Sequence, residues 1–358
     1  MRLWGILLLT SWARLIAATT PDPAGAPRPL VLVHVMPWFE SKSVSGQWGW
    51  HWTMGKTEPD QGALASHDQP ALGAYDSSDP AILATQVALM KAAGIDGAII
   101  DWNGPEGFAD YAMIHRNTVL LVAELKKAGL KFAVCVEDNP GHRFIKEGKL
   151  THAQASAKVA AAFAWADARW LTDPAYVRLA GRPALFIFGP QFLSDAEWSA
   201  IRAKLKSEPL TFALPHLSRR PGIDGIFAWV PVSGGQTVAT PTWSAGLVAL
   251  FAKEIKAGRP FVSVAFPGYR DFYAQAGAGE SYGRIEYRDG RTFAESFKQA
   301  MGSGAPIVQI ATWNDYGEGT GIEPTTERGT RDLEVIMRRL RPDADPAELR
   351  RILDAVKK

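Results

Sequence analysis

Strand-like and helix-like segments alternate along most of this chain, and this alternation constrains the fold more than any other feature. The run "PLVLVHVMPWF" is continuously apolar and rich in β-branched residues, which is typical of a strand buried on both faces. Seven more segments have a comparable strand pattern. The eight predicted strands are 29–39, 95–102, 130–138, 182–190, 210–216, 222–232, 259–269 and 305–315.

Segments with helical periodicity lie between most of these strands. The first of them has Asp79 as a capping residue, Pro80 in its first turn and Gly94 at its end. Little helix is expected between the strands at 210–216 and 222–232. The six predicted helices are 77–94, 114–129, 152–171, 194–206, 243–258 and 292–304.

Regular alternation of this kind predicts an α/β fold with a parallel sheet. Eight units within residues 30–358 favour a single (β/α)8 TIM barrel with extended βα loops. A doubly wound open sheet is the alternative, but no G-x-G-x-x-G turn follows the first strand, which disfavours a dinucleotide-binding version.

The first residues, "MRLWGILLLTSWARLIAATT", have the order of a signal peptide. Arg2 precedes an apolar run that is too short to span a bilayer, and small residues follow it. We therefore predict a signal peptide at 1–18, a Pro/Ala-rich linker at 19–29 and one catalytic domain at 30–358, in a secreted or periplasmic protein.

Charge and cysteine content exclude several classes of partner. The net charge is +2 and no block of five basic residues occurs, so neither nucleic acid nor a membrane is expected as a partner. The single cysteine, Cys135, cannot form an internal disulfide, and its place in "FAVCV" indicates a buried thiol. We expect a monomer.

Acidic and aromatic residues gather where the predicted strands end. Catalytic groups of a (β/α)8 barrel come from these ends, and carboxylates beside flat rings are typical of a carbohydrate site. We predict that acids and His51 bind sugar hydroxyls while tryptophan rings stack on the sugar. The predicted substrate-binding residues are Trp38, His51, Trp52, Asp101, Trp102, Glu137, Asp138, Trp313, Asn314, Tyr316 and Glu323.

The stretch "TWNDYGEGTGIEP" at 312–324 carries the predicted catalytic pair, Asp315 and Glu318. Glycoside cleavage requires two carboxyl groups that flank the scissile bond, one protonated and one ionised. Neighbouring carboxylates raise the pKa of one of them, which suits an acid. The alternative is that Glu318 only caps or solvates the following turn.

Other assignments remain open at this level. The segment "QWGWHWTMG" at 47–55 is either a sugar platform or a lid, and Asp101, Glu137 and Asp138 could form a calcium site. Neither a zinc-type histidine pair nor a G-x-S-x-G elbow occurs, and no cofactor is expected. The rival classes are a non-catalytic carbohydrate-binding barrel and a metal-dependent hydrolase.

The same motifs resemble two families of glycoside hydrolases. Together with "GAYDSSDPAILATQVALMKAAGIDGAIIDW" and "FAVCVED", the stretch "WNDYGEGTGIEP" resembles family 99, the endo-α-1,2-mannosidases, and family 71, the α-1,3-glucanases. Family 99 carries Glu-Trp-His-Glu-Gly-Thr where residues 315–320 read Asp-Tyr-Gly-Glu-Gly-Thr, and family 71 carries Asn-Asp-Tyr-Gly-Glu, which residues 314–318 match.

This resemblance implies a (β/α)8 barrel that cleaves an α-mannan or an α-glucan. It implies that Glu318 is the general acid/base and that Asp315 deprotonates the sugar 2-hydroxyl, so that this oxygen attacks the anomeric carbon. Asp315 is one methylene shorter than the glutamate of family 99. Residues 135–141, "CVEDNPG", also replace a His-Ile-Glu run of that family.

Overall fold

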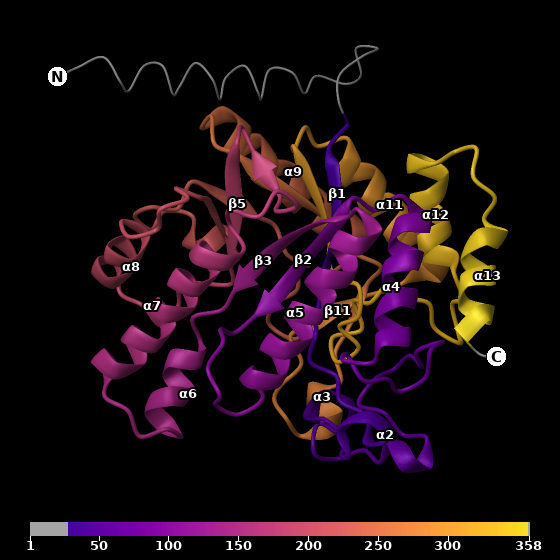
Figure 1. Cartoon of the computed structure of the whole chain (residues 1–358). Coiled ribbons are helices and arrows are strands. Elements are labelled where there is room, and N and C mark those ends of the chain that lie inside the picture. Colours follow the sequence, from indigo (N-terminus) through magenta and orange to yellow (C-terminus); the bar gives the residue numbers. More distant parts are fainter. Residues whose placement is uncertain (1–27, 357–358) are drawn as a thin grey trace.

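Eight apolar strands pair in parallel and close into a barrel in the computed structural model, which describes residues 28–356 (Figure 1). The ring closes between the first and the last strand, where Val31 lies opposite Val308. This closure confirms the single (β/α)8 barrel and excludes the open sheet. The strands are β1 (Leu30–Val35), β2 (Gly97–Trp102), β3 (Lys131–Val136), β5 (Arg182–Ile187), β6 (Leu210–Ala213), β7 (Gly225–Phe227), β9 (Phe261–Ala265) and β12 (Ile307–Ile310).

Helices connect most successive strands and pack outside the barrel. Only the 3₁₀ turn η2 (Pro215–Leu217) lies between β6 and β7, as the sequence predicts. Two helices after β12 lie outside the predicted set and cover the flank next to α4. The barrel helices are α4 (Pro80–Ala93), α5 (Tyr111–Ala128), α6 (Pro140–Lys146), α7 (His152–Arg169), α8 (Asp195–Arg202), α9 (Thr240–Lys256), α11 (Arg291–Met301), α12 (Arg331–Leu340) and α13 (Ala347–Val356).

Local capping explains where two of these helices begin. The Asp79 carboxylate accepts a hydrogen bond from the backbone N–H of Ala81 at 2.8 Å, which satisfies an otherwise free donor at the start of α4. Ser194 and Glu197 form a reciprocal capping box at the start of α8.

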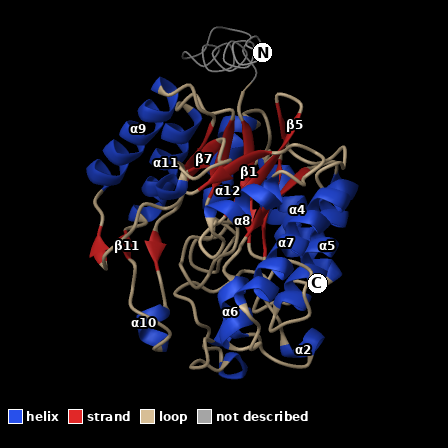
Figure 2. Cartoon of the chain, turned by 90° about the vertical axis from the view of Figure 1, so that its left-hand side faces the viewer, coloured by secondary structure: helices blue, strands red, loops and turns tan. Residues whose placement is uncertain are grey.

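Most of the smaller elements lie in loops near the carboxyl ends of the strands, and they correct parts of the predicted pattern. Residues 47–55 include the short helix α3, and the strand predicted at 222–232 is reduced to β7. Tyr269 belongs to β10, in a small sheet that stands apart from the barrel strands (Figure 2). These elements are α2 (Lys42–Ser45), α3 (Trp50–Thr53), η1 (Pro59–Gln61), β4 (Arg178–Leu179), β8 (Gln236–Thr237), β10 (Tyr269–Arg270), α10 (Tyr273–Ala276), β11 (Gly283–Ile285) and η3 (Arg288–Gly290).

The predicted signal peptide, and the linker up to residue 27, lie outside the described residues. Among residues 28–356, no helix combines the length and apolar character that a bilayer crossing requires. Figure 1 shows α2 and α3 beyond the carboxyl ends of β2 and β3, and the loops around these ends form the candidate site.

Candidate active site

A pocket of about 890 Å³ opens at the carboxyl ends of β1, β2 and β3. The carboxyl groups of Asp101 and Glu137 line it, together with the rings of Trp38, Trp48 and Trp50. A second pocket of about 610 Å³ lies among the loops that follow β7 and β9, and Trp50 borders both pockets. The cavities thus lie on the barrel face where enzymes of this fold place their active sites.

Neighbouring residues of a strand point to opposite sides of the sheet, and the Asp101 side chain is on the side that faces the barrel interior. It pairs in register with Cys135 of β3, and only 3% of its surface is exposed. Burial, followed by the charges of Glu137 and Asp315, raises the pKa of Asp101 well above its ordinary value. This carboxyl therefore holds a proton more readily than a surface aspartate does.

The two acids that follow β3 turn in different directions. Glu137 lines the pocket and accepts a hydrogen bond from the Asn103 amide at 3.2 Å. Burial and then the neighbouring charge of Asp138 raise the pKa of Glu137 to about 7.

Asp138 is fully buried and does not belong to the ligand-contacting set. Its carboxylate accepts hydrogen bonds from the backbone N–H groups of Gln191, Phe192 and Leu193 at 2.8–3.0 Å. These bonds anchor the loop after β5 and use the oxygens that a calcium ion would need. The prediction that Asp138 contacts substrate is therefore corrected. The prediction that it helps to bind calcium is corrected for the same reason.

The loop 312–324 folds back on itself and fixes the positions of the two predicted catalytic acids. The backbone N–H of Thr312 donates to the carbonyl of Thr320 at 2.9 Å, which closes the turn. Inside it, the N–H of Glu318 donates to Asp315 Oδ1 at 3.0 Å. The Asp315 carboxylate thus caps the turn, and the Glu318 side chain takes no part in this bond.

A left-handed glycine allows this turn to lie against the loop after β9. Gly319 has φ +63°, and an added Cβ would lie 2.7 Å from the carbonyl oxygen of Arg270. The N–H of Arg270 donates to the Glu318 carbonyl at 3.0 Å, and that of Phe272 donates to the Gly317 carbonyl at 2.8 Å. The loop after β9, which is distant in sequence, therefore holds the backbone of the turn that bears Glu318.

Asp315 and Glu318 differ in how strongly their surroundings favour the proton. Burial raises the pKa of Asp315 to about 6, although backbone N–H groups stabilise its charged form. Burial and then the charge of Asp315 raise the pKa of Glu318 well above its ordinary value. The hydroxyl of Tyr273 lies 3.4 Å from Glu318 Oε1 and pulls that pKa in the other direction. The surroundings of both carboxyls therefore favour the protonated form, and at Glu318 the charge of Asp315 adds to the effect of burial.

Glu323 is a structural anchor of the loop and not a ligand contact. Its buried carboxylate accepts hydrogen bonds from Tyr75 at 2.9 Å, Tyr316 at 2.8 Å, Gln86 at 2.6 Å and the Trp313 indole at 3.2 Å. With four donors, this carboxylate has little capacity left for a sugar hydroxyl.

Three further residues of this loop that were predicted to bind substrate are also buried. Trp313 has no exposed surface, and Tyr316 and Asn314 are each 2% exposed. The Asn314 amide bonds both the N–H and the carbonyl of Met36. The structure therefore removes all three from the predicted set of substrate contacts and gives them the role of holding the loop to the barrel.

The predicted aromatic platform is only partly present. Trp38 and His51 line the pocket with their rings stacked, with 4.0 Å between centroids and 8° between planes. Burial lowers the pKa of His51 despite the opposing effect of nearby Asp110. Trp52 and Trp102 have no exposed surface, so the prediction that they stack on a sugar is corrected.

Two tryptophan rings that are not among the predicted substrate-binding residues take the place of Trp52 and Trp102. Trp48 and Trp50 line the pocket, and Trp50 is 48% exposed. Both come from the same run, "QWGWHW", as Trp52, and the density of tryptophan there was the available signal. Tyr273, which contacts Glu318, had no such signal because it lies in the short helix α10, in the connection after β9.

Taken together, the molecule is a (β/α)8 barrel whose carboxyl-end pockets combine buried acids of raised pKa with accessible aromatic rings. Two solved structures of the GH99 endo-alpha-mannosidase from Bacteroides thetaiotaomicron are similar to it, one of them in complex with bis-tris propane. Each has a TM-score of 0.64 over 91% of this chain and 96% of that chain, with 22% and 20% sequence identity respectively.

A structure described as a glycoside hydrolase-like protein is also similar, with a TM-score of 0.62 and 12% identity over 91% of this chain and 99% of that chain. No family model matches the sequence, and no curated protein does. At these identities the likeness shows the fold. It confirms the family 99 resemblance at the level of the fold, and the family 71 resemblance stays a prediction.

Proposed function

We propose that this chain is an exported, monomeric glycoside hydrolase that cleaves an α-linked glycan, with Glu318 as the acid and Asp315 as the base or nucleophile. The observation that carries the proposal is the pair itself. The two carboxyls lie three residues apart on one turn, the Asp315 carboxylate accepts a hydrogen bond from the Glu318 backbone N–H, and burial raises the pKa of both groups. When two carboxyls lie this close together, the charge of one favours the proton on the other, which suits a pair that shares the acid and base roles.

In the proposed reaction, protonated Glu318 donates its proton to the leaving glycosidic oxygen as the bond to the anomeric carbon breaks. Ionised Asp315 takes the proton of the sugar 2-hydroxyl, whose oxygen then attacks the anomeric carbon. In the alternative, the Asp315 carboxylate itself attacks that carbon. Glu318, now the base, then removes a proton from a water molecule whose oxygen attacks the anomeric carbon. This attack breaks the bond from that carbon to O2, which takes its proton back from Asp315, or the ester bond to Asp315.

The groups that line the pocket at the ends of β1, β2 and β3 suit recognition of a sugar. The carboxyls of Asp101 and Glu137 offer hydrogen bonds to hydroxyls, and Trp38, Trp48 and Trp50 offer apolar faces. The α-linkage is supported by the sequence resemblance and by the similarity to a structure named as an endo-alpha-mannosidase. Both α-mannan and α-glucan are candidate substrates.

A product-resolved screen tests the proposal. We expect the purified protein to release oligosaccharides from an α-mannan or an α-glucan, and an Asp315→Asn variant to release none at the same protein concentration. Product anomers followed by NMR report whether configuration is retained or inverted. Cleavage should persist in EDTA, because no step of the proposed reaction uses a metal.

Two results would replace the proposal by a rival. Tight glycan binding without products over a long incubation would indicate a non-catalytic carbohydrate-binding barrel. Loss of cleavage with chelator would indicate a metal-dependent hydrolase. Sequencing the N-terminus of protein recovered from the culture medium or periplasm tests export, and gel filtration tests the monomer.

A further inference from the structure

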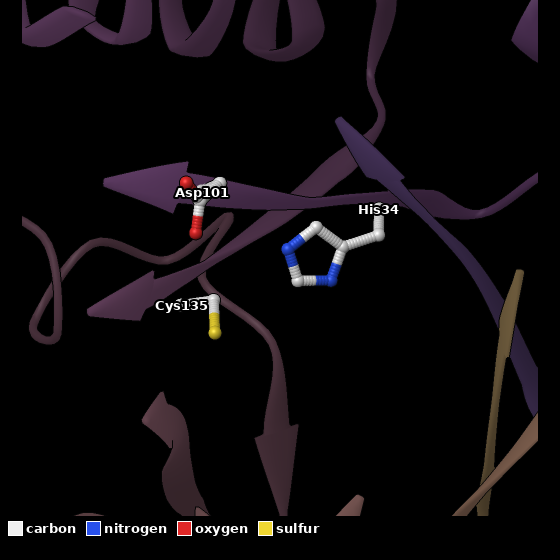
Figure 3. Close-up of side chains that lie close together, drawn as sticks. All are labelled: His34, Asp101 and Cys135. Atoms are coloured by element: carbon white, nitrogen blue, oxygen red, sulfur yellow. The ribbon is translucent and has the colours of Figure 1, made fainter. Parts of the chain in front are cut away.

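The first three barrel strands direct three different donor atoms to one point inside the barrel. His34 comes from β1, Asp101 from β2 and Cys135 from β3, and all three side chains point toward one another (Figure 3). The donor atoms lie within 4.8 Å of one another. His34 and Cys135 have no exposed surface, and Asp101 has 3%.

The hydrogen bonds of Gln309 determine which nitrogen of His34 carries the proton. The Gln309 side-chain N–H donates to the carbonyl of Ala228 at 3.1 Å, so its Oε1 is the acceptor for His34 Nδ1 at 3.3 Å. Nδ1 then holds the hydrogen and Nε2 presents a lone pair.

This lone pair has no partner within the described part of the chain. Nε2 is buried without a hydrogen bond, and Figure 3 shows one ring nitrogen of His34 on the side facing Asp101 and Cys135. Buried polar atoms are nearly always paired, so an orphan aimed at a carboxylate and a sulfur requires an explanation. All three atoms donate electron pairs, and a cation would satisfy them together.

We propose that His34, Asp101 and Cys135 bind one divalent cation of the zinc class. Imidazole nitrogen, carboxylate oxygen and thiolate sulfur are the donor types that zinc takes in proteins. Three donors spaced by up to 4.8 Å surround a point no more than about 2.8 Å from each. Shifts of roughly half an ångström would bring them to zinc distances of about 2.0–2.3 Å.

Charge balance favours the same ion. One carboxylate and one thiolate neutralise the two charges of the cation, and the thiol proton leaves to solvent when the metal binds. Asp101 also lines the pocket, so a cation from solvent reaches the cluster through it. The cation site shares Asp101 with the proposed sugar pocket, but it does not involve Asp315 or Glu318, and its test needs no substrate.

Cobalt(II) provides a direct probe, because a thiolate bound to cobalt absorbs in the near ultraviolet by charge transfer. Cys135 is the only cysteine of the chain, so such a band reports this site alone. We expect titration of the metal-free full chain with cobalt chloride to develop the band and saturate at one equivalent, and zinc to abolish it by displacement.

Three variants and an unfolded sample sharpen the result. Cys135→Ser should lose the band, and Asp101→Asn, at the pocket, should weaken cobalt binding by roughly tenfold or more. His216→Gln, on η2 and outside the cluster, should leave the titration unchanged, and urea-unfolded protein should show no stoichiometric band. Absence of the band in the folded wild type, or an equal titration in Asp101→Asn, would overturn the proposal.

Discussion

Replacing Glu318 with glutamine removes the proton donor of the proposed pair and keeps its shape. The amide oxygen can still accept from the Tyr273 hydroxyl, now 3.4 Å from Oε1, and the Glu318 N–H bond to Asp315 belongs to the backbone. We therefore expect the variant to fold with a melting temperature close to that of the wild type.

The expected loss follows from what a positioned acid contributes. General acid catalysis supplies about 10²–10⁴ in rate, which is roughly 3–5 kcal/mol of barrier. kcat/KM on an α-linked oligosaccharide should fall by that factor. An aryl glycoside with a good leaving group needs little protonation, so its kcat/KM should fall far less.

The pH profile separates the two carboxyls. The base works ionised, so the rate should rise as pH passes through the Asp315 pKa of about 6. The acid works protonated, so the rate should fall as pH rises through the elevated pKa of Glu318. On the aryl glycoside, Glu318→Gln should lose the alkaline limb and keep the acidic limb.

Glu208→Gln is the matched control, since Glu208 is exposed just before β6, at the opposite end of the barrel from the pocket. It should behave as the wild type in every assay. An oligosaccharide rate within threefold of the wild type in Glu318→Gln, or equal losses on both substrates, would refute the assignment of Glu318 as the acid.

Three other perturbations test the surrounding structure. Tyr316→Phe removes one donor to buried Glu323, so the free energy of unfolding in urea should fall by about 1.5–3 kcal/mol; a change below about 0.5 would contradict the anchor role. Glu137 has a folded pKa of about 7 against about 4.3 unfolded, so its contribution to stability is present below pH 4.3 and is lost as pH rises through 7. Glu137→Gln should abolish this loss, worth up to roughly 4 kcal/mol. A wild type and variant with parallel urea stabilities from pH 4 to 8 would disprove it. Trp50→Ala removes an exposed ring between the two pockets and should raise KM several-fold at nearly constant kcat, whereas an unchanged KM would exclude Trp50 from binding.

The barrel could be predicted from sequence because local signals and global packing agree. Strands buried on both faces leave continuous apolar runs, and Asp79 and Ser194 mark helix starts through bonds made within three residues. The small sheet could not be predicted, because β8 and β10 are two residues long and pair across the chain.

Candidate site residues were harder to predict, because position at a strand end does not fix direction. Asp101 and Trp102 are neighbours, yet the acid faces the interior while the indole packs outward against Trp165 and Trp170. Strand alternation contains that information for Trp102. For Asp138 and Glu323, direction depends on backbone and hydroxyl donors far along the chain, which no local pattern reveals.

The backbone hydrogen bonds between the β9 and β12 loops affect how the substrate specificity of such a barrel can change. Backbone bonds from Arg270 and Phe272 hold the turn that bears Glu318, and Met36 of the β1 loop bonds Asn314 beside it. The pocket walls built by the β2 and β3 loops lie outside this set of bonds. In the proposed reaction, the loops after β9 and β12 thus hold the acid, and the loops after β2 and β3 supply residues that contact the sugar. Exchanging segments of the β2 and β3 loops should change which sugars bind, while the turn that bears Glu318 keeps its position.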